Sequence, residues 1–152
     1  MRSFILFTLC ILSINSIAQD LKQDTVNLWK SKAGELQFIS GEAEAGITYK
    51  YMSFNFKDTN TLATPIYPNP KSIEIFNGEY LDILTKNLSE AITKSNQKIA
   101  NSWDLKGKQQ ILINDTTDFI YLFNDTNSTY FSAEEGGRLI QALKKEAYRL
   151  EQ

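Results

Sequence analysis

The sequence predicts an α+β fold, in which an antiparallel sheet of about five to six strands carries two long helices packed on one face. Two segments have apolar residues at helical spacing, and the other regular segments are short runs rich in β-branched and aromatic residues. Strands follow one another through short polar turns, and a strand–helix–strand order occurs at most once. This order argues against a parallel α/β sheet, which needs repeated crossover connections.

The first 18 residues have the features of a cleavable secretory signal peptide. Arg2 gives a positively charged start, Phe4–Leu12 is an apolar run, and the small residues Ser16 and Ala18 precede the expected cleavage point. The apolar run is shorter than the roughly 20 residues that span a membrane. We therefore expect Met1–Ala18 to be removed on export, which leaves the protein in the periplasm or secreted.

The remaining residues 19–152 are expected to form a single α+β domain of 134 residues, enough for one hydrophobic core. The alternatives for the leader are a buried N-terminal helix, an uncleaved anchor, or a lipid-modified Cys10. Lipidation is disfavoured because Leu9, and not a small residue, precedes Cys10 within the apolar run. The short leader and the frequent Asn, Lys and Ile residues favour a bacterial source.

The first part of the domain is expected to contain two strands, Glu35–Ser40 and Ile47–Phe56, with a turn at Gly41–Gly46 between them. Polar residues make Gln19–Asn27 a loose leader, and Leu28–Lys32 is a candidate for a short additional strand. The strand Ile47–Phe56 is the clearest, because it is rich in aromatic and β-branched residues. Its apolar alternation changes phase between Tyr51 and Met52, so we expect either a β-bulge or a strand covered on both faces.

A loop, a strand and a helix are predicted next. Asp58–Pro70 contains all three prolines of the chain, which exclude a regular element there. Lys71–Phe76 alternates like a short strand. Asn77 is a suitable N-cap for a helix over Gly78–Ala100, whose apolar residues fall on one face.

The last third predicts three more strands and a second helix. The strands are expected at Gln109–Asn114, Phe119–Phe123 and Thr129–Phe131. Ser132 and Glu135 form a capping box that opens the helix. Gly136 and Gly137 in its first turns each cost about 1 kcal/mol against alanine. Close packing would explain these glycines, and so would simple tolerance.

Composition excludes several kinds of chemistry. The chain has no histidine, and its one cysteine lies in the expected signal peptide. Ser-His-Asp and Cys-His catalysis and Cys/His zinc sites therefore lack their essential groups. The net charge of −2 becomes −3 without Arg2, and no basic block is present, so nucleic acid is not an expected partner. We predict a non-enzymatic protein with no cofactor and no metal, and no stable membrane insertion after signal cleavage.

Acidic residues leave an alternative open. Glu42 and Glu44 are a conceivable carboxylate pair for a hydrolase, although they lie in a turn of small residues. Oxygen-bearing residues also cluster in two later turns, where Asx-turn chemistry explains them without a calcium ion. These residues are Asp115, Asp118, Asn124, Asp125 and Asn127.

Aromatic residues supply the main functional hypothesis. Phe119–Phe123 is apolar on both faces, which is typical of a central strand, and Phe119, Tyr121 and Phe123 share one of them. Tyr49 and Tyr51 would extend this aromatic surface. We predict that it binds a protein or a small apolar ligand through Tyr49, Tyr51, Tyr121 and Phe123.

Two readings compete with an open aromatic surface. In one, the loop Asp58–Pro70 and the N-terminal segment cover the aromatic face as a second core layer. In the other, the protein is an inhibitor or immunity-type protein that uses the same loop to block a secreted or envelope enzyme. The carboxylate-dependent hydrolase remains a third possibility of a different class.

Overall fold

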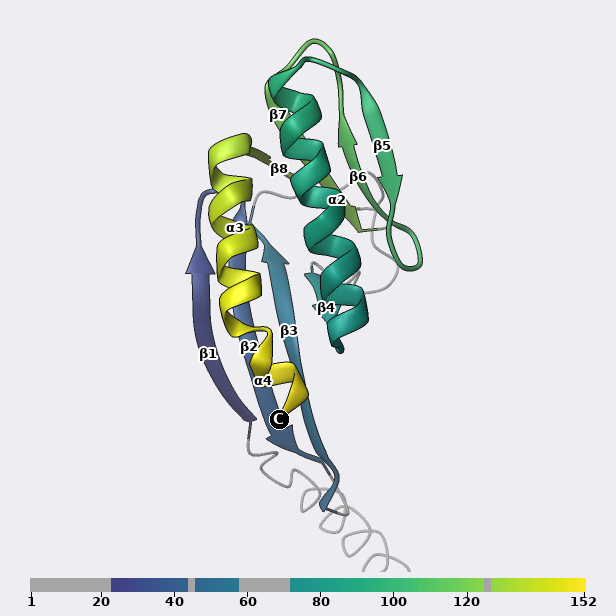
Figure 1. Ribbon diagram of the computed structural model, residues 1–152. Helices are drawn as coiled ribbons and strands as arrows, with labels where there is room; N and C mark the ends of the chain where they lie inside the picture. Colours follow the sequence, from purple (N-terminus) through teal and green to yellow (C-terminus); the bar gives the residue numbers. More distant parts are fainter. Residues whose placement is uncertain (1–22, 44–45, 58–71, 125–126) are drawn as a thin grey trace, which may run out of the picture.

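The computed structural model describes residues 23–43, 46–57, 72–124 and 127–152, which form two antiparallel sheets and a layer of helices (Figure 1). The first sheet has the order β1-β2-β3-β4 and the second β5-β6-β7-β8. The bounds of the first half are β1 Gln23–Lys30, β2 Gly34–Glu42, β3 Thr48–Phe56, β4 Ser72–Ile75 and α2 Gly78–Asn96. Those of the second half are β5 Asn101–Asp104, β6 Gln109–Ile113, β7 Phe119–Asn124, β8 Asn127–Ser132, α3 Ala133–Glu146 and α4 Tyr148–Glu151.

The prediction of one sheet with five to six strands is wrong, because the structure has two sheets of four strands each. α2 separates the two sets of strands along the chain. Its 19 residues carry the chain about 28 Å from the end of β4, so β5 begins a new sheet. The α+β class holds. Each half is a four-stranded antiparallel meander followed by a helix, although the sequence shows no repeat.

The number of strands was also underestimated. β1 begins at Gln23, within the segment expected to be a loose leader, because an edge strand is held by backbone pairing with β2 and needs no apolar pattern. β5 was not predicted, since it has only four residues, of which Trp103 is the single apolar one. The predicted signal peptide lies outside the described residues.

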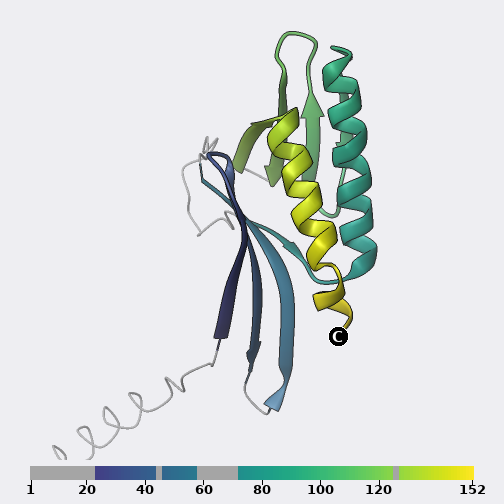
Figure 2. The same cartoon turned by 60° about the vertical axis from the view of Figure 1, so that its left-hand side comes forward.

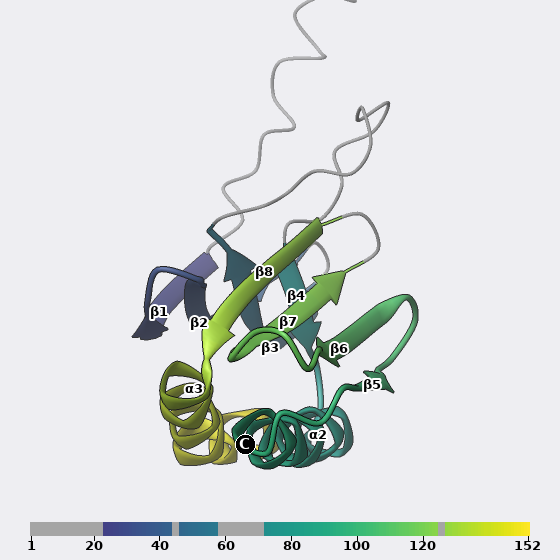
Figure 3. The same ribbon diagram turned by 90° about the horizontal axis from the view of Figure 1, so that it is seen from above.

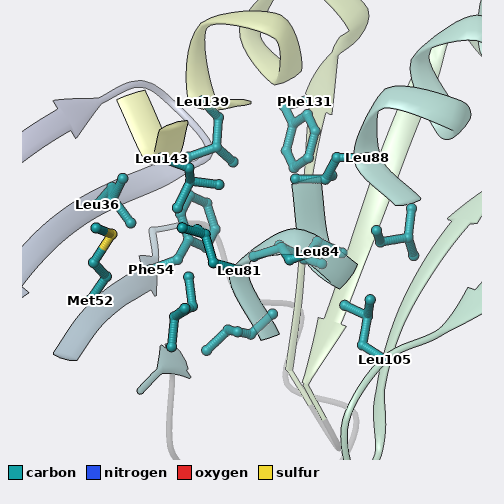
Figure 4. Packing of buried hydrophobic residues seen from close by; sticks show 14 of the residues in the cluster. Leu36, Met52, Phe54, Leu81, Leu84, Leu88, Leu105, Phe131, Leu139 and Leu143 are labelled. Carbon is teal, nitrogen blue, oxygen red and sulfur yellow. The ribbon is translucent and has the colours of Figure 1, made fainter. Parts of the chain in front are cut away.

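Helices α2 and α3 pack against each other and lie on one side of both sheets (Figures 2 and 3). α2 contacts β4 of the first sheet and β5, β6 and β7 of the second, whereas α3 contacts β1, β7 and β8. The two sheets therefore share one hydrophobic core (Figure 4). Its fully buried large side chains are Leu36, Met52, Phe54, Ile73, Ile75, Leu88, Ile111, Ile120, Leu122, Phe131, Leu139 and Leu143.

Hydrogen bonds join the two sheets directly. The Thr129 hydroxyl on β8 donates to the Ala33 carbonyl in the turn between β1 and β2, at 2.7 Å. The Asn124 amide at the end of β7 donates to the Ser72 carbonyl at the start of β4. Both acceptors are backbone groups at the ends of strands in the first sheet. These bonds fix one sheet relative to the other where no strand ladder connects them.

The helix ends follow the local signals of the sequence. The Asn77 side chain accepts a hydrogen bond from the Tyr80 amide at 2.9 Å, and Ser132 and Glu135 form the predicted capping box. α2 stops at Asn96, four residues before the predicted end, and Lys98 adopts a left-handed φ of 56°. Ile99 is consequently exposed and does not extend the apolar face of the helix.

The phase change in β3 requires no bulge. The register with β2 is continuous from Gly34↔Phe56 to Glu42↔Thr48. Met52, Phe54 and Phe56 point to the core, while Tyr49 and Tyr51 lie on the opposite face and are partly exposed. The continuous register is against a β-bulge, and among the described residues the outer face at Tyr49 and Tyr51 is only partly covered.

Candidate functional site

The outer face of the second sheet, which points away from the helices, carries four aromatic side chains. Phe119, Tyr121 and Phe123 alternate along β7, and Tyr130 on β8 pairs directly with Tyr121. Ring centroids are 5.0 Å apart for Phe119–Tyr130, 6.0 Å for Tyr121–Tyr130 and 6.5 Å for Tyr121–Phe123. We call this group of four the aromatic face.

The alternation of β7 explains why these rings are left outside. Ile120 and Leu122 point inward and are essentially inaccessible, so their neighbours must point outward. Phe119 is 42 % exposed and Tyr130 46 % exposed. Tyr121 and Phe123 are partly exposed. Four neighbouring rings in contact with water form a patch, and not scattered single residues.

Mostly polar residues surround the aromatic face. The strand register places Leu112 beside Tyr121, Ser128 beside Phe123 and Ser132 beside Phe119 on the same side of the sheet. On the strands farther out, the outward positions are Ser102, Asp104 and Gln110. Among the described outward positions of this sheet, Asp104 is therefore the one charged residue. An apolar centre with a polar rim is the usual composition of a protein–protein contact surface.

The structure divides the four predicted binding residues between the two sheets. Tyr121 and Phe123 belong to the aromatic face, whereas Tyr49 and Tyr51 lie on β3 of the first sheet. There, Tyr51 contacts Tyr49 and Phe76, with ring centroids 6.3 Å and 5.1 Å away. All four predicted side chains are partly exposed, so none is fully buried.

Sequence reasoning missed Tyr130 as a member of the aromatic face. Its strand was predicted, and the apolar Phe131 beside it gave the inward phase, so alternation alone would have placed Tyr130 outward. What could not be read was its partner, because the pairing of Tyr130 with Tyr121 depends on the register between β7 and β8. The loop Asp58–Pro70, expected either to cover the aromatic surface or to block an enzyme, lies outside the described residues.

The outer face of the first sheet is mostly a hydrogen-bonded row of polar side chains. The Gln37 amide donates to Asn27 and the Asn55 amide donates to Gln37, both at 2.9 Å, and Ser53 donates to Asn55 at 3.1 Å. Burial, followed by the negative charge of Glu74, raises the pKa of Tyr51 beside this row. These polar groups form hydrogen bonds with one another, so fewer of their donors and acceptors remain for a ligand than on an open polar surface.

A cleft lies at the free end of the first sheet, where β1, β2 and β3 extend past the C-terminal helix α4 (Figure 2). Its volume is about 590 Å³, and both Asp24 and Glu42 line it together with Lys50 and Arg149. The Arg149 guanidinium lies 5.5 Å from the centre of the Phe38 ring, and it is paired with Glu146. The cleft thus contains one of the two predicted carboxylates, while Glu44 lies outside the described residues.

In the described part of the chain, no three Asp, Glu, His or Cys side chains lie close enough together to hold a metal ion. The turn after β6 shows what its polar residues do instead. Asn114 Oδ1 accepts from the Thr117 amide and hydroxyl, both at 2.8 Å, and from the Thr116 amide at 3.3 Å. This is Asx-turn chemistry, supplied by Asn114, which was not among the five residues expected to use it. Within the same described ranges, no helix is long and apolar enough to cross a membrane.

Comparison with known proteins does not assign the chain to a family. No family model, no curated protein and no solved structure matches it.

Proposed function

We propose that this protein is an exported, non-enzymatic domain that binds a protein partner through the aromatic face of its second sheet. The observation that carries the proposal is the contact between Phe119, Tyr121, Phe123 and Tyr130, which are left partly exposed on the side opposite the helices. Tyrosine brings a large, rigid contact area at low conformational cost, and both tyrosine and phenylalanine are enriched in protein–protein interfaces.

The shape of the aromatic face favours a protein over a small ligand. Small-molecule sites are concave and enclose most of the ligand. The aromatic face instead lies on the outer side of a four-stranded sheet, and none of the described cavities that we find is lined by its four residues. A flat partner surface can cover all four rings at once, whereas a small apolar molecule would leave most of itself in water.

The composition supports binding without catalysis, and the leader supports export. A mature chain with neither histidine nor cysteine has no imidazole base and no thiol nucleophile.

Export is tested by recovering the protein from the periplasmic or secreted fraction of its source and sequencing its N-terminus. We expect the mature chain to begin at Gln19, and an intact Met1 in that fraction would contradict signal cleavage.

Site-specific crosslinking tests the binding proposal. A photoreactive phenylalanine analogue at position 130 should yield one dominant crosslinked partner in the native envelope fraction. The same analogue at Tyr148, which is 49 % exposed on α4 and not on the aromatic face, is the matched control. Equal crosslinking from both positions would mean that the aromatic face is not the contact surface.

A substitution then measures the energetic contribution. Tyr121→Thr removes the central ring but keeps a β-branched residue in β7, so the strand should persist. If Tyr121 is a main contact, the loss is about 2 kcal/mol, or roughly 30-fold in Kd. Tyr49→Thr on the first sheet is the matched control and should leave Kd unchanged. An unchanged Kd for Tyr121→Thr would refute the proposal.

A second function, carboxylate-dependent hydrolysis, has one observation in its favour, which is that Asp24 and Glu42 line the same 590 Å³ cleft. Hydrolysis by two carboxylates requires them on either side of a bound substrate. If the cleft is catalytic, Asp24→Asn and Glu42→Gln should each abolish hydrolysis of envelope glycans. Absence of any hydrolysis by the unaltered protein would exclude this function.

A further inference from the structure

A hollow of about 240 Å³ lies where the first sheet meets the second, beside the start of α2. β4 contributes Glu74, the end of β7 contributes Asn124, the first turn of α2 contributes Tyr80, and the β5–β6 connection and β6 contribute Lys106 and Gln109. Junctions between structural units are common places for small-ligand sites. This hollow is separate from the aromatic face.

The inner wall of the hollow is formed by buried or half-buried polar side chains. Tyr80 is only 5 % exposed, and its hydroxyl donates to the Gln109 side chain. Burial raises the pKa of Tyr80 to about 12, so the hydroxyl stays neutral. Gln109 and Asn124 are direct cross-strand partners on the inward side of the sheet. Two amides and a neutral hydroxyl thus line the base of one small space, where the Tyr80 proton is donated to Gln109 and the Asn124 amide donates to the Ser72 carbonyl.

The mouth of the hollow carries opposite charges. Glu74 and Lys106 both line it and are both exposed, and the ring of Phe76, 57 % exposed, lies with them. A second hollow of about 350 Å³ shares Tyr80 and Lys106 and adds Glu79 and Asp104. The two hollows together thus have three carboxylates, Glu74, Glu79 and Asp104, and one ammonium group, that of Lys106. This balance favours a ligand that carries a cationic group in addition to an anionic one.

We propose that this junction hollow binds a free α-amino acid, with Glu74 facing its ammonium group and Lys106 its carboxylate. At about 30 Å³ per water molecule, the hollow has room for a solute of about eight non-hydrogen atoms, which is the size of a small amino acid. Phe76 supplies an apolar surface for the side chain, and Gln109 supplies amide hydrogen bonds at the base.

Nuclear magnetic resonance of the mature protein tests this directly. Each small L-amino acid, up to about nine non-hydrogen atoms, is titrated to 20 mM, and the side-chain amide signals of Gln109 and Asn124 are followed. We expect at least one to shift both signals with a Kd of about 1 mM or tighter. The side-chain amides of Gln37 and Asn55, on the outer face of the first sheet, are internal controls and should not move.

Matched probes test the charge pattern. For the amino acid that binds, the amine without its carboxylate and the acid without its ammonium are titrated in the same way; for L-valine these are isobutylamine and isovalerate. Each should bind at least ten-fold more weakly. Glu74→Gln and Lys106→Gln should each weaken binding about ten-fold, whereas Lys145→Gln on α3 should not change it.

Two results would overturn the proposal. One is that no amino acid moves the Gln109 and Asn124 signals at 20 mM. The other is that the amine alone binds as tightly as the zwitterion, which would make the hollow a simple cation site. Neither result bears on the aromatic face, whose partner is tested by crosslinking from position 130.

Discussion

Gly136 and Gly137 are neighbours in the first turns of α3, yet their surroundings predict opposite responses to alanine. A Cβ atom on Gly136 would lie 3.0 Å from Phe131 Cε2 and 3.3 Å from Ile92 Cδ1, whereas one on Gly137 would have no atom within 4 Å. Gly136 therefore lies where α3 is in tight contact with Ile92 of α2 and Phe131 of β8. Gly137 has no such neighbour.

The two substitutions share one gain and differ in one cost. Alanine improves helix propensity by about 1 kcal/mol at either position. At Gly137 this gain stands alone, so Gly137→Ala should raise the free energy of unfolding by about 1 kcal/mol and the Tm by roughly 4 °C. At Gly136 an overpacked core costs about 1–3 kcal/mol, so Gly136→Ala should be neutral or destabilising by up to about 2 kcal/mol.

Urea unfolding followed by circular dichroism at 222 nm measures both variants against the unaltered domain. The expected result is a higher midpoint for Gly137→Ala and an equal or lower midpoint for Gly136→Ala, with the same slope. If Gly136→Ala stabilises the domain as much as Gly137→Ala, α3 does not approach Phe131 and Ile92 as closely as the structure shows. The shared core of the two sheets would then need revision.

Three further outcomes are expected. Burial raises the pKa of Tyr80 to about 12 from 10.0, so the unfolded chain loses the Tyr80 proton at a lower pH than the folded chain. The free energy of unfolding should therefore hold below pH 10 and fall between pH 10 and 12. Tyr80→Phe should remove that fall, which unfolding curves at alkaline pH would show. Thr129→Val removes one of two donors to the Ala33 carbonyl, which keeps the Lys57 amide at 3.1 Å, and should cost about 1 kcal/mol in chemical unfolding, whereas a cost near zero would show that this bond does not hold the sheets together. Asn77→Ala removes the cap of α2 and should cost about 1 kcal/mol, with Asn77→Asp as the control that keeps it.

The aromatic hypothesis illustrates how far alternation can be taken. The pattern of Phe119–Phe123 correctly indicated one aliphatic and one aromatic side, and Ile120 and Leu122 do face the core. The alternation within one strand does not indicate which aromatic residues of other strands lie on the same side of the sheet. Tyr49 and Tyr51 have the right residue type but belong to the other sheet, and Tyr130 completes the group through strand pairing.

The junction hollow shows the same limit more strongly. Glu74, Tyr80, Lys106 and Gln109 have no common motif, and they come from a strand, a helix, a turn and another strand. Nothing in their spacing predicts that they meet. Their proximity follows from the way α2 carries the chain from one sheet to the next.

Local chemistry determined the features that depend on neighbours in sequence. The cap at Asn77, the capping box of Ser132 and Glu135, and the strand alternation of β7 involve residues within a few positions of one another, so short-range hydrogen bonding and side-chain periodicity specify them. The division into two sheets, the partner of each strand and the tight contact at Gly136 were decided by tertiary structure alone. These features depend on which surfaces, distant in sequence, pack against each other. A periodic pattern indicates that one face of an element is buried, but it does not identify the element that covers that face.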